Sequence, residues 1–67
     1  MRFNNRTAVV TGAAAGIGKS AARLLAEHGV KVIMLDRDEK RLAEAAAEIR
    51  GKVSGAEIST VTADVGD

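Results

Sequence analysis

The chain has 67 residues with no cysteine and one histidine, and its 10 basic and 9 acidic side chains leave a net charge of +1. This composition excludes a disulfide framework and a thiolate or histidine-rich metal centre, and it argues against nucleic acid as a partner. No apolar run reaches the roughly 18 residues of a membrane span, and the polar N-terminal segment is unlike a secretory signal, so we expect a cytoplasmic location.

The first two predicted elements are a strand over residues 6–11 and a helix over residues 16–28. The strand, Arg-Thr-Ala-Val-Val-Thr, is rich in β-branched residues. The helix carries apolar residues at positions i, i+4, i+7 and i+8 of one face, which we expect to pack against the core. These residues are Ile17, Ala21, Leu24 and Leu25. Gly29 is placed to end the helix in a left-handed conformation.

A second strand and a second helix follow along the chain. Residues 31–36 form a continuous apolar run between charged residues, which is typical of a strand buried on both faces of a parallel sheet. Asp38 is suited to cap the next helix, which we expect Gly51 and Gly55 to end. The residues of this helix predicted to face the core are Leu42, Ala45, Ala46 and Ile49.

Residues 57–62 form a third predicted strand, which is more polar than the others and is therefore expected at an edge of the sheet. Strands that alternate with helices predict an α/β fold of Rossmann-like βαβαβ type with a three-stranded parallel sheet. With right-handed crossovers and the strand order 3-2-1, both helices lie on one face of the sheet. This arrangement is the first half of a doubly wound fold.

The second predicted strand is apolar on both of its faces. Val32 and Met34 point to one side of the sheet, and Ile33 and Leu35 point to the other. The two helices cover only one of these faces, and the first strand keeps an unpaired edge. We therefore expect residues 1–67 to be the N-terminal part of one larger domain, truncated here. Further chain segments, or a second copy of the chain in a homo-oligomer, would cover the open face.

The junction between the first strand and the first helix reads Thr-Gly-Ala-Ala-Ala-Gly-Ile-Gly over residues 11–18. Gly12 permits a tight turn, Gly16 lets a phosphate approach the backbone, and Gly18 lets the helix pack close to the strand. The start of the helix presents free N–H groups to an anion. The junction therefore predicts binding of the diphosphate of a dinucleotide, and the alternative is a glycine-rich turn that binds nothing.

An acidic side chain, Asp36, ends the second strand 18 positions after Gly18. At that spacing a carboxylate can hold a ribose 2′-hydroxyl, and the alternative is a solvated acid at a strand end. The neighbouring Arg37 could hold a 2′-phosphate, but Asp36 would repel that phosphate and Ala15 supplies no positive charge. We therefore expect NAD as the cofactor, with NADP less favoured.

A second phosphate-binding motif overlaps the first one. Residues 13–20 read Ala-x-x-x-x-Gly-Lys-Ser, a relaxed form of the P-loop of nucleoside triphosphatases. That motif requires glycine where this chain has Ala13, and of the three glycines in the junction it explains only Gly18. The dinucleotide interpretation is therefore preferred, with a P-loop-like nucleotide-binding module as an alternative.

These residues resemble the N-terminal signature of the short-chain dehydrogenase/reductase family. The family pattern Thr-Gly-x-x-x-Gly-x-Gly is matched over residues 11–18, and Asp36 matches the acid that selects NAD in many members. Asp64 and Val65 resemble the pair after the third strand whose acid contacts adenine. The resemblance implies an NAD(P)-binding segment of an oxidoreductase that transfers hydride between nicotinamide and a carbonyl or alcohol substrate. The implied cofactor-binding residues are Gly12, Ala14, Ala15, Gly16, Ile17, Gly18, Asp36, Arg37, Asp64 and Val65.

The catalytic residues of that family are not found in this chain. It contains no tyrosine, so the Tyr-x-x-x-Lys pair is absent, and Ser54 and Ser59 have no base nearby in sequence. The resemblance covers about the first quarter of a typical member, so we expect the adenosine half of a cofactor site without catalytic residues. The alternative from a different class is a non-catalytic Rossmann fragment that self-associates through its open face and edge.

Overall fold

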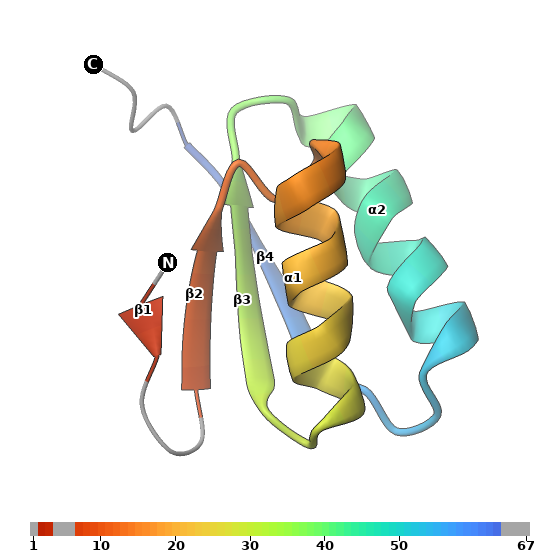
Figure 1. Cartoon of the computed structure of the whole chain (residues 1–67). Coiled ribbons are helices and arrows are strands. Elements are labelled where there is room, and N and C mark those ends of the chain that lie inside the picture. Colours follow the sequence, from red (N-terminus) through yellow and green to blue (C-terminus); the bar gives the residue numbers. More distant parts are fainter. Residues whose placement is uncertain (1, 4–6, 64–67) are drawn as a thin grey trace.

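The computed structural model describes residues 2–3 and 7–63, with side chains over residues 7–63. Within these ranges the elements are β1 (Arg2–Phe3), β2 (Thr7–Thr11), α1 (Gly16–Glu27), β3 (Lys31–Asp36), α2 (Glu39–Lys52) and β4 (Ile58–Thr62). The strands form one sheet in the order β1-β2-β3-β4, and both helices lie on the same face of it (Figure 1). The bounds of β2, α1, β3 and β4 agree with the predicted ones to within one residue.

The three longer strands are parallel and confirm the predicted α/β fold. β3 lies between β2 and β4, so the predicted order 3-2-1 is also confirmed. The sequence does not predict β1, which pairs antiparallel with β2 and covers part of the edge that we expected to be open. That expectation is wrong because a strand of two residues is too short to reveal itself as an alternation of polar and apolar side chains.

The core lies between the sheet and the two helices. Val32 and Met34 of β3 are fully buried there, as predicted. The residues of α2 predicted to face the core are all buried as well: Leu42, Ala45, Ala46 and Ile49. On the opposite face of β3, Ile33 and Leu35 stay partly exposed, and no helix of the described residues covers them (Figure 1). The alternation of side chains along a strand thus predicts correctly which residues of β3 lie on its covered face and which lie on its open face.

The prediction for α1 is wrong about which face is buried. Ile17 is 90% exposed and Leu24 is 56% exposed, whereas the small residues Ala22 and Ala26 are buried. Leu25 is partly buried and packs against the core. The first turn of α1 lies so close to the end of β2 that Gly18 has no room for a side chain. Small residues take most of the face toward the sheet, and Ile17 and Leu24 point away from it.

The helix ends are formed by glycines and by one carboxylate. Gly29 follows α1 with a φ of +79°, the left-handed conformation that we expected. The Asp38 carboxylate accepts a hydrogen bond of 3.0 Å from the N–H of Arg41, which confirms Asp38 as the N-cap of α2. Gly51 does not end α2, because one glycine in the last turn costs only about 1 kcal/mol; the chain turns instead at Gly55, with a φ of +75°.

Candidate functional site

The candidate site lies at the carboxyl ends of β2 and β3, where the chain enters the two helices (Figure 1). The segment from Gly12 to Gly18, here called the glycine-rich turn, leads from β2 into α1. Gly12 leaves the strand with a φ of +63°, a conformation that favours glycine. Parallel sheets bind ligands outside these strand ends, so the topology makes this edge, here called the rim, the expected place for a ligand.

Two glycines of the turn differ in their surroundings. A Cβ atom on Gly18 would lie 2.3 Å from the carbonyl oxygen of Gly12 and 2.9 Å from its carbonyl carbon. A Cβ atom on Gly16 would meet nothing within 4 Å. Gly18 therefore allows the helix to approach the strand, whereas Gly16 leaves the backbone accessible from outside.

The backbone amides of the turn fall into two groups. The N–H groups of residues 13, 14 and 15 are used within the protein, at N···O distances of 3.2, 3.0 and 3.1 Å. The N–H groups of residues 16–18, at the start of α1, donate to no partner among the described residues. Ala15 is the N-cap of α1 and offers no side-chain acceptor. Free amides at a helix N-terminus are suited to an anion.

The carboxylate of Asp36 is held by two backbone amides. Its Oδ1 accepts from the N–H of Asp38 at 3.1 Å, and its Oδ2 accepts from the N–H of Ala14 at 3.0 Å. These hydrogen bonds, first the one from Asp38 and then the one from Ala14, lower the pKa of Asp36. The charge of Arg41 acts weakly in the same direction. Each oxygen of the ionised group keeps a further lone pair, so Asp36 can also accept hydrogen bonds from ligand hydroxyls.

The structure brings together two features that the sequence predicts separately. Ala14 and Asp36 are 22 positions apart, and their hydrogen bond ties the glycine-rich turn to the end of β3. The main-chain carbonyl of Asp36 also accepts from the N–H of Ala63, after β4, at 3.0 Å. Sequence reasoning misses both bonds, because no spacing rule relates the backbone amide of an alanine to a distant residue. Asp64 and Val65, the predicted adenine contacts, lie outside the described residues.

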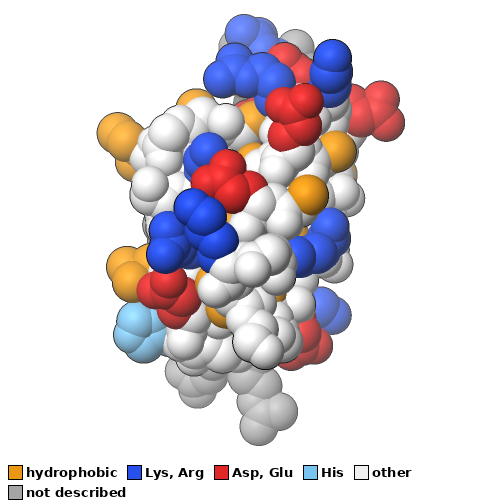
Figure 2. Space-filling view, turned by 90° about the vertical axis from the view of Figure 1, so that its right-hand side faces the viewer, with side chains coloured by type: hydrophobic (Ala, Val, Ile, Leu, Met, Phe, Trp, Pro, Cys, Tyr) orange, Lys and Arg blue, Asp and Glu red, His pale blue; other side chains and the backbone are white. Residues whose placement is uncertain are grey.

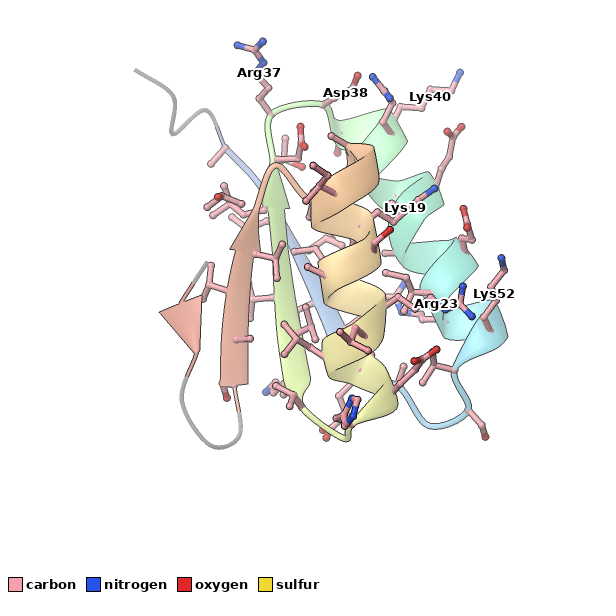
Figure 3. All side chains as sticks on the ribbon, viewed as in Figure 1. Lys19, Arg23, Arg37, Asp38, Lys40 and Lys52 are labelled. Carbon is pink, nitrogen blue, oxygen red and sulfur yellow. The ribbon has the colours of Figure 1, made fainter. Side chains whose placement is uncertain are left out.

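Two basic side chains, those of Arg37 and Lys19, lie near this rim. Arg37 extends away from the sheet (Figure 3), and its side chain pairs with none of the described residues. Lys19 points toward α2, where its Nζ lies 3.1 Å from Oε1 of Glu48. This ion pair lowers the pKa of Glu48. In the P-loop alternative Lys19 would reach back to the phosphates, and its position beside Glu48 does not favour that interpretation.

An open pocket of about 170 Å³ lies between α1 and α2. It is lined by Ala14, Lys19, Arg41, Glu44, Ala45 and Glu48. Figure 2, which looks onto the side of α2, shows basic and acidic side chains intermixed there and no patch of a single sign. In the described ranges, no cluster of His, Cys, Asp or Glu is arranged to hold a metal ion, and no helix is long and apolar enough to cross a bilayer.

Three parallel strands, a glycine-rich turn into the first helix and an acid at the end of the next strand define a Rossmann-like α/β protein. The chain matches the model of the short chain dehydrogenase family over residues 6–67, and it belongs to that family. This confirms the resemblance that the sequence carries in residues 11–18 and in Asp36. The family consists of oxidoreductases that bind nicotinamide cofactors.

Relatives and solved structures agree with this assignment. The chain is 43% identical to 1-deoxy-11-beta-hydroxypentalenate dehydrogenase of Streptomyces exfoliatus over 67 residues, which are 100% of this chain and 24% of that protein. The structure of the NADPH-dependent reductase YwfH matches with a TM-score of 0.87 and 30% identity, over 96% of this chain and 26% of that one. A metagenomic short-chain oxidoreductase in complex with NADP matches with a TM-score of 0.80 and 37% identity, over 90% and 26% of the two chains. The chain thus spans about a quarter of the length of these proteins.

Proposed function

We propose that this chain forms the adenosine and diphosphate half of the NAD site of a short-chain dehydrogenase. One observation carries the proposal: the three unpartnered amides of residues 16–18 and the ionised carboxylate of Asp36 lie at the same rim of the sheet. A dinucleotide needs donors for its diphosphate and an acceptor for its ribose, and the rim offers both. The open space around Gly16 fits the approach of a diphosphate to the backbone.

Each part of the rim has a separate role in this proposal. The amides of residues 16–18 donate to the diphosphate oxygens, and the Asp36 carboxylate accepts from the ribose hydroxyls. Ala14, Ala15 and Ile17 are proposed to line the path between these two groups, and Gly12 and Gly18 to fix the course of the turn. Asp64 and Val65 are proposed to contact the adenine.

The preference for NAD over NADP rests on the charge of Asp36. The hydrogen bonds that lower its pKa keep the carboxylate ionised at neutral pH, so a 2′-phosphate would face a negative charge. Arg37 could offset part of this repulsion, while Ala15 offers no cation. Similar structures include an NADPH-dependent and an NADP-bound protein, and the preference is therefore drawn from these residues and not from the relatives.

In the whole protein we propose hydride transfer between the nicotinamide and a small carbonyl or alcohol substrate. When bound, the cofactor supplies the nicotinamide that gives or takes the hydride. The residues of this chain hold and orient the adenosine end, and none of them is proposed to be catalytic. The cytoplasmic location and the homo-oligomer, or further chain segments covering the open sheet face, stay predictions.

Calorimetric titration with NAD and NADP tests the proposal. Gly16→Val should weaken NAD binding at least about tenfold, because the side chain fills the space through which the diphosphate approaches. Asp36→Ala should weaken it by about tenfold or more through the loss of charged hydrogen bonds. Gly51→Val is the matched control, because its Cβ also meets nothing within 4 Å and it lies in α2, away from the rim. Unchanged NAD affinity in both rim variants would refute the proposal.

The two alternatives make different predictions for the same protein. A self-associating fragment would show a mass by light scattering that rises with concentration and does not respond to NAD. Partial exposure of Ile33 and Leu35 and the 44% exposure of Val61 are the observations that favour this alternative. A P-loop-like module would bind ATP with magnesium more tightly than NAD.

A further inference from the structure

We propose that Asp36 is also a positioning residue, which fixes the glycine-rich turn in its binding shape before any cofactor arrives. This inference rests on the proposed function, because it concerns the same rim. It differs in its claim, since the carboxylate acts on the protein backbone and not only on the ribose. Loss of Asp36 should then weaken binding of the diphosphate part of the cofactor as well as binding of the ribose.

The division of amides in the turn is the first support for this inference. The amides of residues 13, 14 and 15 are occupied within the protein, and the next three, residues 16–18, are free for a ligand. The occupied amides fix the course of the turn directly before the free amides at the start of α1. Two of the three internal bonds go to main-chain carbonyls, those of Leu35 and Gly12. Only the bond from Ala14 depends on a side chain, that of Asp36.

The second support is that Asp36 links every loop of the rim that the structure describes. Its carboxylate receives the amide of Ala14 from the glycine-rich turn and the amide of Asp38 from the β3–α2 loop. Its carbonyl receives the amide of Ala63 at the end of β4. Removal of the side chain leaves two of these three links without an acceptor, and the remaining main-chain bond does not reach the glycine-rich turn.

A consequence follows for the geometry of the carboxylate. With Oδ1 and Oδ2 each bound to a different loop, the group cannot rotate without breaking a hydrogen bond to a charged acceptor. Asparagine has nearly the same shape as aspartate, but its amide nitrogen cannot accept a hydrogen bond. Asp36→Asn must therefore lose one of the two links, whereas Asp36→Ala loses both.

Amide hydrogen exchange on the ligand-free protein tests the inference directly. In Asp36→Ala the amides of Ala14 and Asp38 should exchange about tenfold faster than in the wild type, the loss expected for a hydrogen bond to a charged group. In Asp36→Asn only one of the two amides should respond. Asp38→Ala is the control for the amide of Ala14, because it removes an acid of the same loop whose side chain caps α2 and does not contact the glycine-rich turn. In this variant the amide of Ala14 should exchange as in the wild type. Protected helix amides, such as that of Ala46, verify that each variant is folded.

A second arm separates the positioning role from contact with the ribose. Binding of ADP and of 2′,3′-dideoxy-ADP is compared between the wild type and Asp36→Ala. If Asp36 positions the turn, the variant should bind the dideoxy compound severalfold more weakly than the wild type, although no ribose hydroxyl is present. Equal affinity for the dideoxy compound, or unchanged exchange at Ala14, would overturn the inference. Failure of the wild type to bind ADP would instead refute the proposed function, and the exchange experiment would still decide the positioning role.

Discussion

Substitution of Gly18 by alanine tests the close contact on which the site is built. The added Cβ would lie 2.3 Å from the Gly12 carbonyl oxygen and 3.1 Å from the Ala13 Cα atom. Ordinary contact begins near 3.4 Å, so the turn and α1 must separate by about 1 Å. Overpacking of this kind costs about 1–3 kcal/mol, and the neighbouring hydrogen bond from Ala13 to Leu35 adds about 1 kcal/mol if it breaks. Alanine returns up to about 1 kcal/mol in helix propensity, so we expect a net loss of about 2 kcal/mol.

Urea denaturation followed by circular dichroism measures this loss. Gly16→Ala is the control, because it lies two positions away in the same helical turn and its Cβ meets nothing within 4 Å. We expect this control to unfold at the same urea concentration as the wild type or at a slightly higher one, since alanine is the better helix former. Equal urea midpoints for Gly18→Ala and Gly16→Ala would show that the contact between Gly18 and Gly12 does not constrain the turn. The close approach of α1 to β2 would then not explain why Ile17 and Leu24 are exposed.

Three further predictions concern single side chains. The pKa of Asp36 is lower in the folded protein than in the unfolded chain. The ionised carboxylate therefore stabilises the fold at pH values above the unfolded-state pKa of about 3.9, and this stabilisation is lost as the pH falls through the folded-state pKa. The urea midpoints of the wild type and of Asp36→Asn should accordingly converge in acid. Asp38→Ala should cost about 1 kcal/mol in urea unfolding through loss of the N-cap of α2, whereas Asp38→Asn should cost much less. Leu42→Ala should cost about 2–5 kcal/mol because Leu42 is 1% exposed, whereas Leu24→Ala, at a residue 56% exposed, should change the stability by less than about 0.5 kcal/mol.

The parts of the fold that the sequence predicts well are those that depend on local periodicity. β3 is apolar at every position between its charged ends, and the buried residues of α2 repeat with helical spacing. The N-cap at Asp38 and the left-handed Gly29 are also local features, and each needs only its own neighbours to form. These features are confirmed because no distant part of the chain opposes them.

The buried face of α1 could not be predicted in this way, because a tertiary contact, and not the hydrophobicity of the side chains, decides which residues face the sheet. Ile17 and Leu24 have the helical spacing of core residues, yet Ala22 and Ala26 take the inner face. The distance between α1 and the sheet decides this outcome, and that distance depends on Gly18 meeting the Gly12 carbonyl. A periodicity rule ranks residues by hydrophobicity and carries no information about how closely two elements approach.

The site was predictable as a set of residues but not as a connected structure. Residues 11–18 and Asp36 follow from a motif and a spacing. Family membership confirms the resemblance that these residues carry, and their role in cofactor binding stays a prediction. The bond between Asp36 and the amide of Ala14 depends on the register of β2 against β3, in which Thr11 lies opposite Leu35. That register brings the residues that follow the two strands within hydrogen-bonding distance of each other. The register cannot be predicted from the sequence of either strand alone.

The requirements of the rim explain why α1 exposes its largest apolar side chains. For the amides of residues 16–18 to stand beside Asp36, α1 must begin directly at the end of β2, and Gly18 allows that approach. A helix held this close to a sheet accepts alanine on its inner face, so Ile17 and Leu24 must lie on the outer one. Exposure of these residues is therefore a structural consequence of the close approach of α1 to β2, and the large buried side chains of the core come instead from β3 and α2, among them Val32, Met34 and Leu42. If the close approach of α1 to β2 builds the site, Gly18→Ala, which moves α1 away from β2, should weaken NAD binding severalfold in calorimetric titration, whereas Leu24 should stay exposed.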